Sequence, residues 1–443
     1  MLCATNVTGL LTDLYELTMS AGYFEAGKAT QKATFELSVR RLPTGRNFII
    51  AAGLPQCADY LLNLRFTAEE IGYLRGLPQF AQVSPAFFDY LGAFRFTGDL
   101  FAVPEGTPLF AGEPMMMVRA PLIEAQIPET YLLSAITFQS LIATKAARMV
   151  EAGDGHGIVE FGTRRAHTPE AGILAARAAY IGGCLGTSNA LTGLRFGIPV
   201  FGTAAHSWVL SFSNEMDSFR QLQKLLGPQT VQLIDTYDTL EGARRAAELG
   251  PPLWGVRLDS GDIVTLARQV RAILDQAGLR DSKIMVTGDL DEYKIRDIVS
   301  DGAPVDLFGV GTELATSGDA PSMGTVYKLV EVDICGIKRF TAKFSENKGT
   351  LPGAKQLFRL PDRDVLGRAA ECCSGAEALL RPVILGGNLV EPLPDAQAAQ
   401  ARAFDSIAKL PAALRSLEPV EPRPVEYSKD LVALIERTRK NLA

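Results

Sequence analysis

The chain has 443 residues, of which 47% are hydrophobic and 21% charged, and its formal net charge is −6. One hydrophobic core seldom grows beyond about 250–300 residues, so this length predicts two domains. The acidic balance argues against a general nucleic-acid binder and against a protein that adheres to anionic membranes.

The first 135 residues mix short β-type runs with helical patterns. Residues 1–20 carry two carboxylates and no basic segment, so we expect no signal peptide. Residues 35–64 combine a β run with a helix, and residues 98–121 hold turn sequences between short strands. We expect a small α+β domain here, followed by a long helix over 130–153.

From residue 157 onward, short apolar runs alternate with helical patterns. The runs are continuously hydrophobic, as expected when helices cover both faces of a parallel sheet. This alternation predicts an α/β fold, with the strands in either a barrel or an open sheet. The runs lie at 157–161, 198–205, 230–237, 253–262, 283–292 and 305–314.

Polar residues gather where each of these runs ends, in six segments that we call the rim. The carboxyl ends of parallel strands lie at one edge, where α/β enzymes place their active sites. A rim rich in Gly, Arg, Asp, Thr and His therefore predicts an enzyme. The segments are EFGTRRAH (160–167), GTAAHS (202–207), DTYD (235–238), RLDSGD (257–262), TGDLDE (287–292) and GVGTE (309–313).

Two rim segments offer charged side chains next to flexible backbone. Arg164 and Arg165 follow a predicted strand and precede a helix, a setting that suits a carboxylate or phosphate; a surface ion pair is the alternative. Asp259 and Asp262 flank Gly261 and could bind ribose hydroxyls or hold Mg²⁺ through water. Asp262 could equally cap the next helix.

Small residues at two further strand ends, Gly288–Asp289 and Gly311–Thr312, suit phosphate binding through backbone N–H groups. Together these segments predict a phosphorylated sugar substrate.

His206, one of three histidines, could be a core residue, but its position at a strand end favours a general base, a metal ligand or a nucleophile.

Beyond residue 335 the alternation ends, and residues 383–425 are rich in Pro and Ala. A closing helix is expected over 428–440, with Ser428 as its N-cap. None of the six cysteines has zinc-finger or Cys-x-x-Cys spacing, which predicts reduced thiols in a cytoplasmic protein.

At these motifs the chain resembles the nicotinate phosphoribosyltransferases, the type II phosphoribosyltransferases of NAD salvage. Any one motif alone would be weak, but together they are specific and span nearly the whole sequence. They are TDLYELTM (12–19), FELSVRRLP (35–43), EFGTRRAH (160–167), GTSNALTG (186–193), GTAAHS (202–207), GVRLDSGD (255–262), TGDLDEYKI (287–295), FGVGTEL (308–314) and YKLVE (327–331).

The resemblance implies an ATP-coupled, ligase-type reaction. Nicotinate, 5-phosphoribosyl 1-pyrophosphate, ATP and water would give nicotinate mononucleotide, pyrophosphate, ADP and phosphate. It also implies an irregular α/β barrel over 136–335 and a smaller α+β sandwich domain built from 1–135 and 336–443. The family forms homodimers with shared active sites. The zinc-binding cysteine cluster of some relatives is reduced here to Cys372 and Cys373, so we expect no structural zinc.

Site roles also follow from the resemblance. His206 would be phosphorylated by ATP, and the carboxylates Asp259 and Asp289 would serve catalysis beside the ribose. The nicotinate site would consist of Tyr15 from the partner subunit, Phe161, Arg164, Thr203 and Arg257. The ribose and phosphates would contact Ser260, Gly261, Gly288, Gly311 and Thr312, with Arg40, Arg41, Lys343 and Lys348 as looser phosphate contacts and Mg²⁺ bound through the pyrophosphate.

Three alternatives stay open. The first is a nicotinamide phosphoribosyltransferase, although the neutral Ser188 and Asn189 spare a nicotinate carboxylate from repulsion. The second is another barrel enzyme, such as an aldolase or a metal hydrolase, which would need a rim lysine or a metal cluster. The third is a non-catalytic dimeric binding protein on the same fold.

Overall fold

The computed structural model describes residues 8–344 and 349–442. They divide into two compact units, one formed by Met1–Leu141 with Ser322–Ala443 and the other by Ile142–Pro321. The sequence placed the second boundary at 335, but β12 (Gly324–Ile334) pairs with β1 (Lys32–Arg41) and so belongs to the first unit. The first unit, expected to be the smaller, is the larger of the two.

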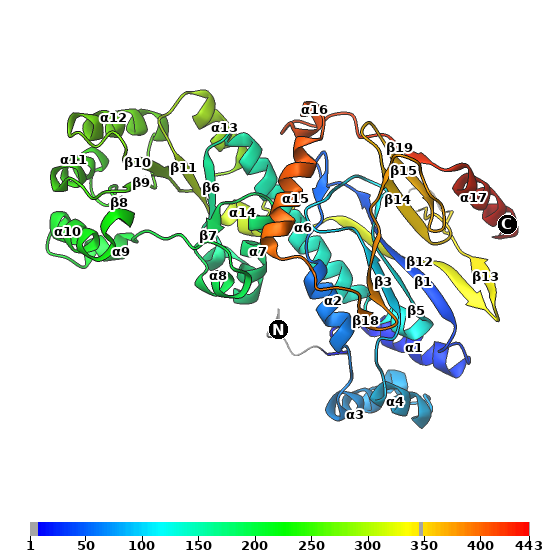
Figure 1. Ribbon diagram of the computed structural model, residues 1–443. Helices are drawn as coiled ribbons and strands as arrows, with labels where there is room; N and C mark the ends of the chain where they lie inside the picture. The colour runs from blue at the N-terminus through cyan, green and yellow to red at the C-terminus, as the bar shows by residue number, and fades with distance from the viewer. Residues whose placement is uncertain (1–7, 345–348, 443) are drawn as a thin grey trace. The chain divides into compact units, whose positions relative to one another are not determined.

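The first unit is built around an antiparallel sheet with the strand order β13-β12-β1-β5-β3-β17-β18 (Figure 1). Phe35 of β1 faces Leu329 of β12 on one side and Val118 of β5 on the other, so the ladder joins the two ends of the chain. The remaining strands of this sheet are β13 (Ile337–Phe340), β5 (Pro114–Pro121), β3 (Asp99–Ala102), β17 (Arg381–Leu385) and β18 (Asn388–Leu389).

A second, four-stranded sheet and a short strand pair complete the β structure that is described for this unit. Helices pack with these sheets, and α6 carries the unit boundary at 141/142. The strands are β16 (Glu377–Ala378), β14 (Lys355–Arg359), β15 (Asp364–Arg368) and β19 (Val425–Tyr427), with β2 (Ile49–Ile50) and β4 (Pro108–Leu109) as the pair. The helices are α1 (Leu14–Glu25), α2 (Leu54–Asn63), α3 (Ala68–Gly76), α4 (Pro85–Gly92), α5 (Leu122–Gln126), α6 (Glu129–Ala152), α15 (Ala396–Ala408), α16 (Ala412–Arg415) and α17 (Lys429–Leu442).

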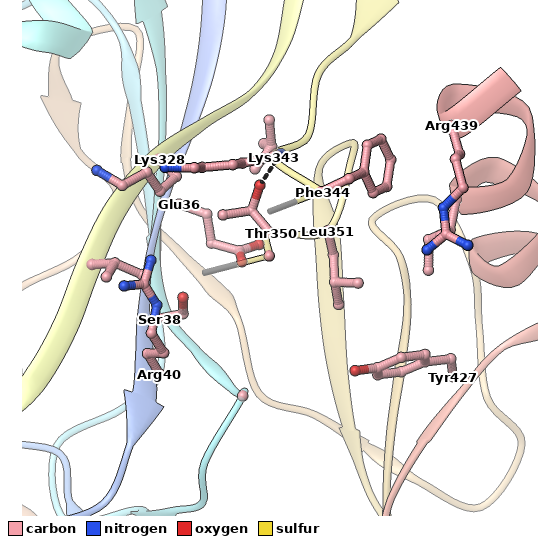
Figure 2. Close-up of a pocket in the computed structure, with 15 residues that line it drawn as sticks. Glu36, Ser38, Arg40, Lys328, Lys343, Phe344, Thr350, Leu351, Tyr427 and Arg439 are labelled. Atoms are coloured by element: carbon pink, nitrogen blue, oxygen red, sulfur yellow. Dashed lines mark hydrogen bonds between the residues drawn. The ribbon is translucent and has the colours of Figure 1, made fainter. Parts of the chain in front are cut away.

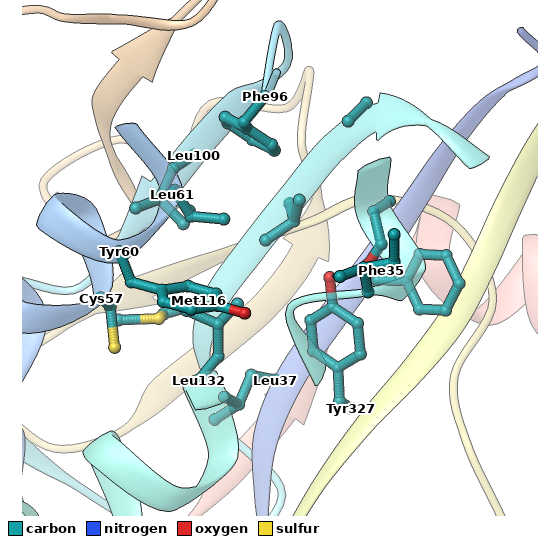
Figure 3. Packing of buried hydrophobic residues seen from close by; sticks show 14 of the residues in the cluster. Phe35, Leu37, Cys57, Tyr60, Leu61, Phe96, Leu100, Met116, Leu132 and Tyr327 are labelled. Carbon is teal, nitrogen blue, oxygen red and sulfur yellow. The ribbon is translucent and has the colours of Figure 1, made fainter. Parts of the chain in front are cut away.

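The core of the first unit combines residues from distant parts of the sequence (Figure 3). Phe35 stacks on Tyr327 with ring centroids 5.0 Å apart, and Tyr60 stacks on Tyr131 at 3.8 Å. The buried Tyr327 hydroxyl donates to the Ala125 carbonyl at 2.6 Å, so its polar end is satisfied. Burial of such apolar ring surface is favourable and helps to hold the sheet and its helices together.

The second unit is a parallel α/β fold with the strand order β7-β6-β11-β10-β9-β8. Thr187 of β7 adds a parallel bridge to Val200. In the described residues no pairing joins that bridge to β8, so the strands form an open sheet and not the closed barrel that the resemblance implied. The strands are β6 (Gly157–Glu160), β7 (Gly186–Thr187), β8 (Val231–Leu233), β9 (Gly255–Leu258), β10 (Lys283–Val286) and β11 (Leu307–Val310).

Helices follow these strands as the sequence pattern predicted. In α12 the buried residues Ala267, Val270 and Leu274 are spaced by three and four, which puts them on one face of the helix. The helices of this unit are α7 (Pro169–Ile181), α8 (Ala190–Phe196), α9 (His206–Leu210), α10 (Glu215–Leu226), α11 (Thr239–Leu249), α12 (Ile263–Gln276), α13 (Glu292–Ser300) and α14 (Thr312–Thr316). Among the described residues, every helix is too short or too polar to cross a membrane.

Candidate active site

The carboxyl ends of β8, β9 and β10 bring together most of the polar side chains that the sequence singled out. Arg257, near the end of β9, lies at the centre and is only 12% exposed. Its Nη1 donates to Thr203 Oγ1 at 2.8 Å and to the Ala204 carbonyl at 3.1 Å, while its Nε donates to Thr287 Oγ1 at 2.8 Å. The guanidinium therefore connects three rim segments.

Asp259 is the anionic partner of this arginine. Its Oδ1 accepts from Arg257 Nη2 at 2.7 Å and from the Thr287 hydroxyl. Burial by itself would raise the pKa of Asp259, but these hydrogen bonds and the Arg257 charge outweigh it and hold the pKa below its usual value. The carboxylate is thus ionised at neutral pH, as a group that stabilises positive charge must be.

His206 lies on the rim and not in the core, and its side chain is 41% exposed. It is the first residue of α9. Its Nδ1 is 3.2 Å from Thr236 Oγ1, and its Nε2 is 3.8 Å from Asp259 Oδ2 and 4.0 Å from Asp235 Oδ1. One ring nitrogen is therefore held by a hydroxyl, while the other faces two carboxylates.

Asp235 is a site residue to which sequence reasoning assigned no role. Its side chain is only 1% exposed, and its Oδ2 accepts from the Asp259 backbone N–H at 3.1 Å and from Ser260 Oγ at 2.7 Å. Its Oδ1, which faces His206, is buried without a hydrogen-bond partner in the described part of the chain. The available signal was its place in DTYD, directly after a strand.

The loop after β6 supplies an aromatic surface. A Cβ on Gly309 would lie 2.6 Å from the ring of Phe161 and 2.6 Å from Thr287 Cγ2, so only glycine leaves room for the ring there. Arg164, in the short 3₁₀ helix Thr163–Arg165, is exposed. The Thr203 hydroxyl oxygen accepts a hydrogen bond from Arg257.

A buried carboxylate lies beneath this loop. Glu160 accepts from the Gly162 backbone N–H and from Thr187 Oγ1. Burial raises the pKa of Glu160 despite these hydrogen bonds and the charge of Arg164. Asn189 caps α8 and donates to Thr163 Oγ1 at 3.1 Å, so its neutral amide shapes the loop.

The glycines of the rim allow a tight approach of backbone segments. Gly261 and Gly288 have φ of +90° and +94°, and a Cβ on Gly288 would lie 2.2 Å from the Asp259 carbonyl oxygen. Asp289 follows with φ of +45° and is exposed. Gly311 and the exposed Thr312 mark the start of α14.

Other rim carboxylates cap helices. Asp262 accepts hydrogen bonds from Thr265 N at 3.3 Å and from Thr265 Oγ1 at 2.8 Å. It therefore caps α12, which is the second of the two roles that the sequence left open for it. Asp238 and Asp291 cap α11 and α13 in the same way. No group of three or more His, Cys, Asp or Glu side chains in the described ranges is arranged to hold a metal ion.

Four of the expected site residues that the structure describes lie in the first unit, namely Tyr15, Arg40, Arg41 and Lys343. Tyr15, in α1, is 47% exposed, and burial together with Glu129 and Glu16 raises its pKa well above the usual value. Arg41 ends β1 and is exposed. Lys343 lines a cavity of about 470 Å³ together with Arg40, Lys328, Arg439 and Glu36 (Figure 2). Lys348 lies outside the described residues.

Comparison with known proteins places the chain in a family. Models described as the nicotinate phosphoribosyltransferase N-terminal domain and the nicotinate phosphoribosyltransferase family match residues 10–137 and 157–341. The chain is 42% identical to nicotinate phosphoribosyltransferase pncB2 of Mycobacterium tuberculosis, over 98% of the chain and 94% of that protein. It is 33% identical to the human nicotinate phosphoribosyltransferase over 96% of each. The chain belongs to the nicotinate phosphoribosyltransferase family.

The structural comparison agrees. The crystal structure of human nicotinic acid phosphoribosyltransferase matches with a TM-score of 0.82 at 31% identity, covering 96% of this chain and 99% of that one. The structure of nicotinate-nucleotide pyrophosphorylase from Pyrococcus furiosus matches with a TM-score of 0.74 at 27% identity, covering 90% and 95%. The α/β fold class with a second domain, which the resemblance implied, is confirmed.

Proposed function

We propose that this protein is an ATP-coupled nicotinate phosphoribosyltransferase that acts as a cytoplasmic homodimer. It converts nicotinate, 5-phosphoribosyl 1-pyrophosphate, ATP and water to nicotinate mononucleotide, pyrophosphate, ADP and phosphate. The observation that carries the proposal is the cluster of His206, Asp235, Arg257 and Asp259 at one edge of the parallel sheet. Family membership over the full chain supports it.

His206 is the residue that ATP phosphorylates. With Nδ1 hydrogen-bonded to Thr236, Nε2 is the free nucleophile; it forms a bond to the γ-phosphorus of ATP while the bond to ADP breaks. The carboxylates of Asp235 and Asp259, within 4.0 Å, stabilise the positive charge that develops on the imidazole. Water later takes the phosphoryl group to give inorganic phosphate and regenerates the imidazole.

Nicotinate lies against Phe161, with Arg164, Thr203 and Arg257 around its carboxylate. A guanidinium suits a planar carboxylate because it donates two parallel hydrogen bonds. Arg257 already makes four hydrogen bonds to protein groups, so the exposed Arg164 has more capacity for the ligand. Tyr15 of a second subunit covers the other face of the ring.

The ribose and phosphates lie over the strand ends of β9, β10 and β11. The ionised Asp259 stabilises positive charge on the ribose ring at the transition state, and Asp289 assists it. Backbone N–H groups at the rim bind the phosphates, with Arg41 and Lys343 completing the site from the second subunit. The backbone contacts come from Ser260, Gly261, Gly288, Gly311 and Thr312.

The oxygen donors at the rim fit Mg²⁺. Asp235 Oδ1 and Asp259 Oδ2, which both lie within 4.0 Å of His206 Nε2, are hard ligands of the kind this ion prefers, but they are too few for a site made of protein alone. An Mg²⁺ ion would therefore be held by these carboxylates together with the substrate pyrophosphate, and it would supply positive charge next to the leaving group.

The test is product formation. Purified protein is mixed with Mg²⁺, 5-phosphoribosyl 1-pyrophosphate and either nicotinate or nicotinamide, with and without ATP, and mononucleotide and ADP are quantified by chromatography. Nicotinate mononucleotide formed faster with ATP, together with ADP, supports the proposal, and His206→Ala removes the ATP effect. Reaction with nicotinamide alone points to the amide-specific transferase, and no product from either base points to a binding protein.

A further inference from the structure

A second basic cavity lies in the first unit, among residues that the transferase proposal does not use. It has a volume of about 510 Å³ and is lined by the end of β14, the turn after it, the segment leading into β17, and α15. We call it the α15 cavity. Its charged lining residues are Arg359, Arg402, Lys409, Arg423 and Glu377.

Two of these cations share one buried carboxylate. Arg359 donates to Asp364 through Nε at 3.1 Å and Nη2 at 2.8 Å, and Arg423 Nε lies 3.3 Å from the same group. Asp364 is fully buried. The neighbouring Glu113 is also buried, and burial, followed by its contact with Asp364, raises the pKa of Glu113 well above the usual range. Glu113 Oε2 also lies 3.6 Å from Arg359 Nη2, so the buried cluster sets two arginines against two carboxyl groups.

The other two cations of the α15 cavity, Arg402 and Lys409, lie outside this cluster. In the chain as described, neither Arg402 of α15 nor Lys409 at its C-terminus has a hydrogen-bond or ion-pair partner. The one acidic lining residue, Glu377, is paired with Arg381 at 2.7 Å. The α15 cavity therefore concentrates positive charge inside a protein whose overall charge is −6.

The rest of the lining is apolar. Leu360, Pro361, Leu379 and Leu410 lie beside the cations. Small-ligand sites commonly have about 300–1,000 Å³ and combine apolar walls with a few charged groups. Arginines with excess positive charge fit a dianionic phosphate, and the apolar walls fit a flat organic body. A concave site of this size does not admit a nucleic-acid duplex.

We propose that the α15 cavity binds a small phosphomonoester of about the size of a nucleoside monophosphate, with Arg402 and Lys409 on the phosphate. All lining residues of the α15 cavity belong to the first unit and none has a role in the transferase proposal, so the inference does not depend on that proposal. Binding is expected whether or not the protein turns over nicotinate.

The test uses the accessibility of Lys409 as a local signal. Full-length protein is acetylated with an amine-reactive reagent in the presence of AMP, inorganic phosphate, or chloride at matched ionic strength, and modification is mapped by mass spectrometry. At AMP about ten times above its Kd, occupancy should slow modification of Lys409 about tenfold. Lys224, an exposed lysine of α10, is the internal control and should not change.

Variants separate binding at the site from other effects. Arg402→Ala should abolish the protection of Lys409, whereas Arg280→Ala, at an exposed arginine elsewhere, should not. If Arg402→Ala does not fold, AMP binding is measured by calorimetry for wild type and for Lys409→Ala. The proposal expects weaker AMP binding to Lys409→Ala than to wild type, and equal binding overturns it. Protection by AMP, with or without phosphate, supports the proposal. Protection by phosphate but not AMP, equal protection by chloride, or no protection overturns it.

Discussion

Replacing Asp235 by Asn tests whether the two carboxylates near His206 serve the ATP-dependent half of the reaction. The amide keeps the size of the side chain and an acceptor for Asp259 N and Ser260 Oγ, but removes a charge 4.0 Å from His206 Nε2. At 4 Å, opposite unit charges attract by about 1 kcal/mol in water and about 4 kcal/mol at an effective dielectric constant of about 20. Stabilisation of a cationic imidazole falls within this range.

His206 is 41% exposed, so water screens part of the attraction and the lower half of the range applies. We therefore expect phosphorylation of His206 to slow about tenfold to a hundredfold, since about 1.4 kcal/mol corresponds to a factor of ten. The assay is rapid-quench detection of the acid-labile phosphoprotein, beside the ATP-independent rate of mononucleotide formation, which should change much less.

A matched control is Asp238→Asn, three residues along the chain. Asp238 caps α11 and is not among the hydrogen-bond or ion-pair partners of His206 in the described part of the chain, so the substitution should leave phosphorylation unchanged. If Asp235→Asn phosphorylates at the wild-type rate, the electrostatic role that we assign to Asp235 is wrong. Equal slowing in both variants would trace the effect to the loop as a whole.

Three further predictions follow from the same region. Gly288→Ala should lower the melting temperature and transferase activity together, because a Cβ would lie 2.2 Å from the Asp259 carbonyl and φ is +94°. Gly309→Ala should raise the KM for nicotinate more than it lowers kcat, because the new methyl would displace the Phe161 ring, 2.6 Å away. Asp259, whose pKa is lowered, stabilises the fold above its unfolded pKa of about 3.9 and loses that contribution as the pH falls through the lowered value. The difference in melting temperature between wild type and Asp259→Asn should therefore shrink below about pH 4, and an unchanged difference would contradict it.

The sequence was most informative where short-range pattern decides structure. Apolar runs followed by polar segments located β6 and β8 to β11, and the long helix expected over 130–153 is α6, Glu129–Ala152. The helix beginning after Ser428 is also confirmed, with Ser428 Oγ accepting from Leu431 N at 3.1 Å. These features depend on residues a few positions apart.

The local sequence pattern did not predict contacts between residues that are far apart in the sequence. The run around Tyr327 looks like one more strand of the second unit, but its antiparallel partner is β1, almost 300 positions away in the sequence. Asp235 was noted as part of a motif, but its burial and its acceptance of Ser260 depend on how two loops meet. Glu160 reads as a rim acid, although it lies beneath the loop that it stabilises.

The pairing of β1 with β12 has a consequence for how the chain folds during synthesis. β1 has β5 on one side from early on, but its other edge stays open until residues 324–334 emerge. The continuous segment Ile142–Pro321 can fold meanwhile, and its folding shortens the loop that must close before β12 docks. Until then β1 presents an unpaired edge, the kind of surface that aggregates. A chain ending at residue 321 should therefore precipitate or bind chaperones, although it contains the complete rim.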